Sequence, residues 1–122
     1  MAGYRDLQVW AKSMDWVEAV YRCAGRWPVD ERFGLISQAR RAAVSVAANI
    51  AEGSGRRTRG EFLQFLGIAK GSLAETETFL MLSARLGYTP RQELAALLSE
   101  SEQIGRMITA LSASLRVPRP KP

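Results

Sequence analysis

The chain has 122 residues, enough for one domain with its own core and too few for two domains of ordinary size. Its composition, 47% hydrophobic and 24% charged, excludes an intrinsically disordered chain. No apolar run approaches the roughly 20 residues of a membrane-spanning helix, and the N-terminal residues lack the pattern of a secretory signal. We therefore expect a single-domain, cytoplasmic protein with no membrane partner.

The formal net charge of +5 comes from 17 basic residues, of which only Lys12, Lys70 and Lys121 are lysine. A guanidinium group binds two phosphate oxygens at once and stacks on bases, so an excess of arginine favours RNA or DNA as a partner. The alternative is a basic surface that serves solubility or reflects an arginine-biased genome.

Apolar residues recur at spacings of three and four between residues 4 and 26, which predicts a first helix. Its main apolar face comprises Leu7, Trp10, Ala11, Met14, Val17, Tyr21 and Ala24. Pro28 ends this segment, and a second helix follows and ends at Gly53. The apolar face of the second helix comprises Phe33, Ile36, Ala39, Ala43, Ala47 and Ile50.

Capping signals predict where the third and fourth helices begin. Thr58 and Glu61 have the spacing of a capping box, in which the threonine hydroxyl accepts a hydrogen bond from the Glu61 backbone. Gly87 closes the third helix, and Thr89 is the expected cap of the fourth, with Pro90 at its first position. The apolar face of the third helix comprises Phe62, Phe65, Leu66, Ala69, Leu73 and Leu80. The apolar face of the fourth comprises Leu94, Leu97, Leu98, Ile104, Ile108, Leu111 and Leu115.

Four amphipathic helices of about 20 residues, joined by short polar turns, bury their apolar faces together in an antiparallel bundle. We therefore predict an all-α protein with up-down-up-down topology in residues 1–115. Residues 116–122, with the sequence RVPRPKP, cannot continue a helix and are expected to form an extended basic, proline-rich tail.

Two helices carry a second uncharged face that the predicted bundle does not use. On the first helix this face comprises Val9, Trp16, Val20 and Cys23. On the third it comprises Gly60, Gly67, Gly71, Ala74 and Thr78, although glycine within a helix costs about 1 kcal/mol relative to alanine. Both faces predict contact with other copies of the chain. The alternative for the glycines is close packing within one chain.

Arg40 and Arg41 are adjacent but are expected to play different roles. Arg41 lies on the polar side of the second helix, whereas Arg40 projects into its apolar half, where an unpaired guanidinium is strongly unfavourable. We therefore expect Arg40 to form a structural ion pair with Glu75 of the third helix.

Nothing in the sequence indicates catalysis. The chain has no histidine, which removes the usual base of serine and cysteine nucleophiles and a common metal ligand. The single cysteine, Cys23, falls within a helical pattern and is interpreted as a packing residue. We expect no enzymatic activity, no metal and no cofactor.

Arginines gather around the turn between the second and third helices. Arg56, Arg57 and Arg59 lie beside the N-terminus of the third helix, whose dipole adds partial positive charge. With Arg41 on the second helix and Arg116, Arg119 and Lys121 in the tail, they form the predicted nucleic-acid-binding set. The alternative is a protein-interaction scaffold whose basic surface meets an acidic partner.

Several motifs resemble those of a known family. They are YRDLQVW, WPVDERFGL, SQARRAAVSVAANIAEGSGR, EFLQFLGIAKGSLAETET and LGY, spread in order over residues 4–88. The chain resembles the four-helix proteins encoded within intervening sequences of bacterial 23S ribosomal RNA genes, a group that includes the accessory variability determinant of diversity-generating retroelements. The resemblance implies a homopentameric barrel with a basic surface and, in the retroelement branch, binding of nucleic acid and a reverse transcriptase. It supplies no catalytic residue. We expect a non-enzymatic protein that binds nucleic acid, with structured RNA favoured.

Overall fold

The computed structural model describes residues 3–118, and these residues form helices joined by short turns. The four α-helices are α1 (Gln8–Gly25), α2 (Leu35–Ser54), α3 (Arg59–Arg85) and α4 (Arg91–Arg116). Two single-turn 3-10 helices, η1 (Tyr4–Asp6) and η2 (Val29–Glu31), precede α1 and α2. Within the described residues, no helix is both long enough and apolar enough to cross a membrane.

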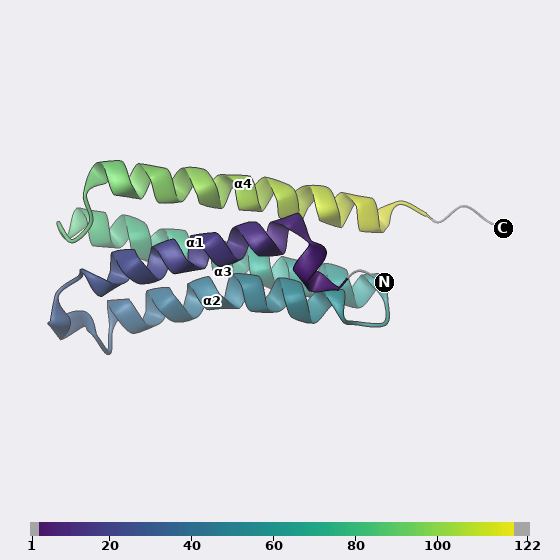
Figure 1. The fold of residues 1–122 in the computed structure, drawn as a ribbon, viewed down its shortest axis with the longest axis horizontal. Helices are drawn as coiled ribbons and strands as arrows, with labels where there is room; N and C mark the ends of the chain where they lie inside the picture. The colour runs from purple at the N-terminus through teal and green to yellow at the C-terminus, as the bar shows by residue number, and fades with distance from the viewer. Residues whose placement is uncertain (1–2, 119–122) are drawn as a thin grey trace.

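The four helices lie side by side along the long axis of the molecule (Figure 1). Each packs against the next in the chain, and α4 packs against α1 to close the bundle. The α1–α2 and α3–α4 turns lie at one end, and the α2–α3 turn lies at the other with η1 and the last turn of α4 (Figure 1). This arrangement confirms the predicted all-α four-helix bundle.

The contact between α2 and α3 is the most extensive in the bundle. On α2 the buried side chains are mainly small, which lets the two backbones approach closely; they are Leu35, Ile36, Ala39, Ala42, Ala43, Val46, Ala47 and Ile50. Near the turn, a Cβ atom on Gly53 would lie 2.7 Å from the Phe65 Cβ. Glycine is therefore required where the end of α2 crosses the start of α3.

The rotation of α1 about its axis differs from the prediction. Trp16 and Val20 are fully buried and Val9 is 4% exposed, whereas Met14 and Tyr21, predicted to be core residues, are 42% and 41% exposed. The expected outer face of α1 is therefore its core face, and the prediction that Val9, Trp16 and Val20 are free for contact with another copy is wrong. The reason is that apolar residues cover a wide arc of α1, and the bundle buries the half that holds Trp16.

Of the two predicted helix caps, the structure contains the one at α3 and lacks the one at α4. The predicted cap of α3 is confirmed, because the Glu61 backbone N–H donates to Thr58 Oγ1 at 3.1 Å. The predicted cap of α4 is wrong: Pro90 occupies the N-cap position without a side-chain hydrogen bond. Thr89 instead turns inward, where it is 4% exposed.

The buried hydroxyl of Thr89 joins the two turns at this end of the bundle. It accepts a hydrogen bond from Trp27 Nε1 at 2.8 Å, and lies 2.8 Å from Ser83 Oγ and 3.5 Å from Cys23 Sγ. Burial raises the pKa of the Cys23 thiol, which agrees with a packing role for this residue. The network satisfies polar groups that have no access to water.

Replacing Thr89 by valine preserves the shape of the side chain and leaves the Trp27 N–H without its partner. A buried unpaired donor costs about 1–3 kcal/mol, so we expect the free energy of unfolding to fall by that amount in urea titrations followed by circular dichroism. Thr109→Val is the control, because the Thr109 hydroxyl only accepts a surface hydrogen bond from Lys70. Equal losses in the two variants would show that the Thr89 hydroxyl does not stabilise this end.

Candidate nucleic-acid interface

The α2–α3 turn presents one arginine that is free of internal partners. Arg57 is exposed and makes no ion pair or side-chain hydrogen bond with any described residue. It lies two residues before the start of α3, where the helix dipole favours an anion and where Thr58 caps the Glu61 backbone N–H. A phosphate group therefore meets both a full charge and a partial positive charge here.

The neighbouring Arg56 is partly neutralised. Its Nη2 lies 2.7 Å from Glu52 Oε1, in an ion pair between residues four positions apart in the sequence. The guanidinium also stacks 4.7 Å from the centre of the Phe65 ring. A surface pair of this kind contributes little to stability, but it reduces the charge that Arg56 offers to a polyanion.

Arg59 holds the end of α4. Its Nη1 donates to the backbone oxygens of Val117 at 2.7 Å and Leu115 at 3.5 Å. The last carbonyls of a helix have no partner within the helix, so a guanidinium supplied by α3 caps them. Arg59 therefore has a structural role that the sequence did not reveal, and it brings Arg116 to the same end of the bundle as the α2–α3 turn.

The structure brings together only part of the predicted arginine set. Arg56 and Arg57 belong to the α2–α3 turn, Arg59 starts α3 and Arg116 ends α4. These elements meet at one end of the bundle, which we call the basic end (Figure 1). Arg41 does not join them, because the 13 residues from Arg41 to the end of α2 span about 20 Å at 1.5 Å per residue. The predicted positions Arg119 and Lys121 lie outside the described residues.

Sequence reasoning missed Arg5, which lies at the same end. Its guanidinium stacks 5.1 Å from the Tyr4 ring, and Tyr4 in turn makes an edge-to-face contact with Trp10 at 5.1 Å. Tyr4 shares a surface hollow with Glu52, the partner of Arg56. The YR dipeptide before the first helix was the available signal for a further arginine near this basic end.

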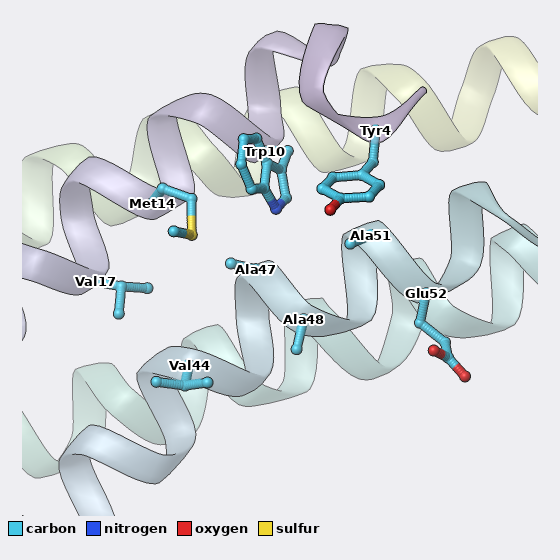
Figure 2. Close-up of a pocket in the computed structure, with 9 residues that line it drawn as sticks. All are labelled: Tyr4, Trp10, Met14, Val17, Val44, Ala47, Ala48, Ala51 and Glu52. Carbon is cyan, nitrogen blue, oxygen red and sulfur yellow. The ribbon is translucent and has the colours of Figure 1, made fainter. Parts of the chain in front are cut away.

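An apolar hollow of about 450 Å³ opens along the seam between α1 and α2. Tyr4, Trp10 and Met14 form one wall, and alanines of α2 form its floor (Figure 2). Met14 and Val44 in this hollow are each 42% exposed. The rotation of α1 thus produces an unpartnered apolar surface, although not the one that the sequence predicted.

The outer face of α3 is exposed as well. Gly67, Gly71, Ala74 and Thr78 all lie at the surface. A Cβ atom on Gly67 or Gly71 would meet nothing within 4 Å. No contact with the described residues therefore requires glycine at Gly67 or Gly71, which argues against intrachain packing as the explanation.

The predicted ion pair between Arg40 and Glu75 is absent from the described residues. Arg40 Nη2 instead donates to the Tyr21 backbone oxygen at 2.9 Å, and its guanidinium lies 4.7 Å from the centre of the Tyr21 ring. Glu75 borders a separate hollow with Arg41. The physical reason is that Arg40 points toward α1. There a hydrogen bond to a carbonyl and a cation–π contact with an aromatic ring take the place of an ion pair with a carboxylate.

Among the described residues, no group of three histidine, cysteine, aspartate or glutamate side chains lies close enough to hold a metal ion. Arginine forks, a helix N-terminus and aromatic faces are groups that bind phosphate and bases.

Comparison with known proteins agrees with the sequence motifs. Among solved structures, the chain is similar to a protein with unknown function from the S23 ribosomal protein family of Bacteroides thetaiotaomicron VPI-5482. The two share 27% sequence identity with a TM-score of 0.75, over 85% of this chain and 97% of the other. No curated protein matches. The profile of the 23S rRNA-intervening sequence proteins matches residues 5–110, which confirms the resemblance, and the chain belongs to this family.

Proposed function

We propose that the protein is a non-enzymatic, self-associating RNA-binding protein whose basic bundle end contacts phosphate groups. The observation that carries this proposal is Arg57, a guanidinium without an internal partner beside the N-terminus of α3. Arg116 lies at the same end and is also exposed. The family description connects these proteins with 23S ribosomal RNA, which makes RNA the favoured polyanion.

Self-association would use the two unpartnered surfaces, which differ in shape. One is the apolar hollow of Figure 2 on the α1–α2 seam, and the other is the smooth face of α3 at Gly67, Gly71, Ala74 and Thr78. Contact between two different surfaces is head-to-tail, and it closes into a ring when the rotation per subunit divides a full turn. A closed ring of this kind is the type of assembly that the family resemblance implies.

A ring also explains how a modest charge becomes an effective binding site. Each subunit offers only a few free arginines at the basic end, and each phosphate contact weakens with added salt. Repetition around the ring lets one long RNA occupy several such ends, so that each later contact is intramolecular. Binding of this kind is tolerant of sequence.

The competing function is a protein-interaction scaffold, either for an acidic partner or for a reverse transcriptase, as in the retroelement branch of the family. The apolar hollow of Figure 2 favours it, because the hollow lies beside the Glu52–Arg56 pair and combines apolar surface with charge of both signs. In that case the arginines would meet carboxylates rather than phosphates.

Charge reversal at the basic end separates the two functions. We expect Arg57→Glu combined with Arg116→Glu to weaken RNA binding strongly, measured by fluorescence anisotropy of a labelled structured RNA at low salt. The slope of log K against log salt should shrink by roughly 0.7–0.9 for each lost phosphate contact. Arg59 is left intact because it caps α4.

The matched control is Arg91→Glu combined with Arg106→Glu, which changes the net charge equally on an exposed part of α4 away from the basic end. If the control variant loses as much RNA affinity as the test variant, the basic end is not the interface. Unchanged affinity in the test variant would favour the scaffold.

A larger side chain on the smooth face of α3 tests the contact between subunits. A Cβ atom at position 71 would meet no described atom within 4 Å, so Gly71→Gln should keep the helical content while it separates the apposed helices. We expect mass photometry to show smaller assemblies than the unmodified protein forms.

The matched control is Gly71→Ala, which raises helix propensity by about 1 kcal/mol and adds only a methyl group. We expect Gly71→Ala to form assemblies closer in size to those of the unmodified protein than Gly71→Gln does. Identical assembly of the glutamine variant, or an unmodified protein that is already monomeric, would contradict an interface at this face.

A further inference from the structure

A second hollow lies at the opposite end of the α1–α2 seam, next to the α1–α2 turn. It has a volume of about 530 Å³ and shares Val44 with the hollow of Figure 2. Its lining includes Arg32, Arg40 and Arg41 together with the aromatic side chains Tyr21 and Phe33, and no carboxylate. We call this surface the aromatic–arginine groove.

Phe33 is the most exposed large apolar side chain of the described residues. It was predicted to belong to the core face of the second helix, but it precedes α2 and is 85% exposed, so that prediction is wrong. The local chain leaves helical geometry at Gly34, which turns Phe33 outward before α2 begins. Burial of such a ring is worth about 2–3 kcal/mol, and no part of the described chain provides it.

Both aromatic rings carry a stacked guanidinium. The Arg32 guanidinium lies 4.8 Å from the centre of the Phe33 ring, and that of Arg40 lies 4.7 Å from the Tyr21 ring. Arg40 is further held by its hydrogen bond to the Tyr21 carbonyl, while its buried Nε has no partner among the described residues. Each guanidinium covers one face of its ring, and Phe33, which is 85% exposed, keeps a ring face open beside this positive charge.

Two nearby carboxylates, those of Glu31 and Glu75, do not line the groove. Glu31 Oε2 accepts from the Tyr88 hydroxyl at 3.0 Å, and its Oε1 accepts from the Leu35 backbone N–H at 3.4 Å. Glu75 borders the neighbouring hollow on the other side of Arg41. Arg32 and Arg41 are exposed and form no ion pair with a described residue, so their charge is available to a polyanion.

We infer that the aromatic–arginine groove binds an unpaired stretch of RNA, of which a base stacks on Phe33 while Arg32 and Arg41 contact the phosphates. This inference rests on the proposed RNA binding and adds a second contact of a different kind. Base stacking on a protein ring requires a base that is splayed out, which a duplex does not offer. The basic end accepts phosphates of paired or unpaired RNA, whereas the groove selects unpaired bases.

The two contacts lie at opposite ends of helices about 30 Å long. An RNA whose helical stem and unpaired segment together span about 30 Å would reach both. The hollow of Figure 2 and the aromatic–arginine groove share Val44 in their linings.

The test compares the RNA affinity of the Phe33→Ala variant with that of the unmodified protein. The two ligands are a labelled 12-nucleotide oligouridine and a labelled RNA duplex of the same length. Stacking is worth about 1–3 kcal/mol per base, so affinity for the single strand should fall about 5- to 150-fold. Affinity for the duplex should stay within about twofold. Val29→Ala is the matched control, because Val29 is a neighbouring apolar side chain that is 70% exposed and does not line the groove.

The outcomes distinguish this inference from the proposed function. Binding of both RNAs by the unmodified protein, with no loss of single-strand affinity in Phe33→Ala, would overturn the groove and leave the basic end standing. Binding of neither RNA would overturn both. A change in assembly size of Phe33→Ala without any change in single-strand affinity would identify the groove as a contact between subunits and overturn the inference.

Discussion

The burial of Trp16 decides which surfaces this bundle presents. The indole is fully buried, and its Nε1–H donates to the Leu97 backbone oxygen of α4 at 3.2 Å. The hydrogen bond satisfies the one polar group of a large apolar side chain and sets the rotation of α1 against α4. Once Trp16 faces inward, Met14 and Tyr21 lie about 140–160° away from it around the helix, and both line hollows along the seam with α2. The apolar hollow and the aromatic–arginine groove both follow from this rotation.

The two ends of the bundle are fixed by polar contacts between residues far apart in the sequence. At one end the Thr89 hydroxyl joins Trp27 and Ser83, and at the other Arg59 caps the last carbonyls of α4. Such contacts add less free energy than the core but specify which turns meet. The basic end and the groove therefore keep defined positions at opposite ends of the same molecule.

The elements of the fold could be predicted because each depends on local sequence. Periodicity located the helices, and the Thr58–Glu61 spacing located the start of α3. The rotation of α1 could not be predicted, because apolar residues cover much of its circumference and the choice depends on a contact between residues 16 and 97. The role of Arg59 likewise depends on a contact between the start of α3 and the end of α4, which lie 56 residues apart in the sequence. At the candidate site, the sequence predicted Arg56, Arg57 and Arg59. It could not show that Arg56 pairs with a carboxylate and that Arg59 caps α4.

That distinction comes from what each guanidinium contacts. Among the described residues, carboxylates pair with Arg22, Arg26 and Arg56, and their charge is offset within the chain. Stacking on a ring, as in Arg32 on Phe33, leaves the charge in place and the edge of the fork free for hydrogen bonds. An arginine on an aromatic ring therefore remains a phosphate ligand, whereas an arginine on a carboxylate must first lose its partner. By this criterion Arg57, Arg32 and Arg41 are better placed to contact RNA than Arg56, although Arg56 lies in the densest run of basic residues.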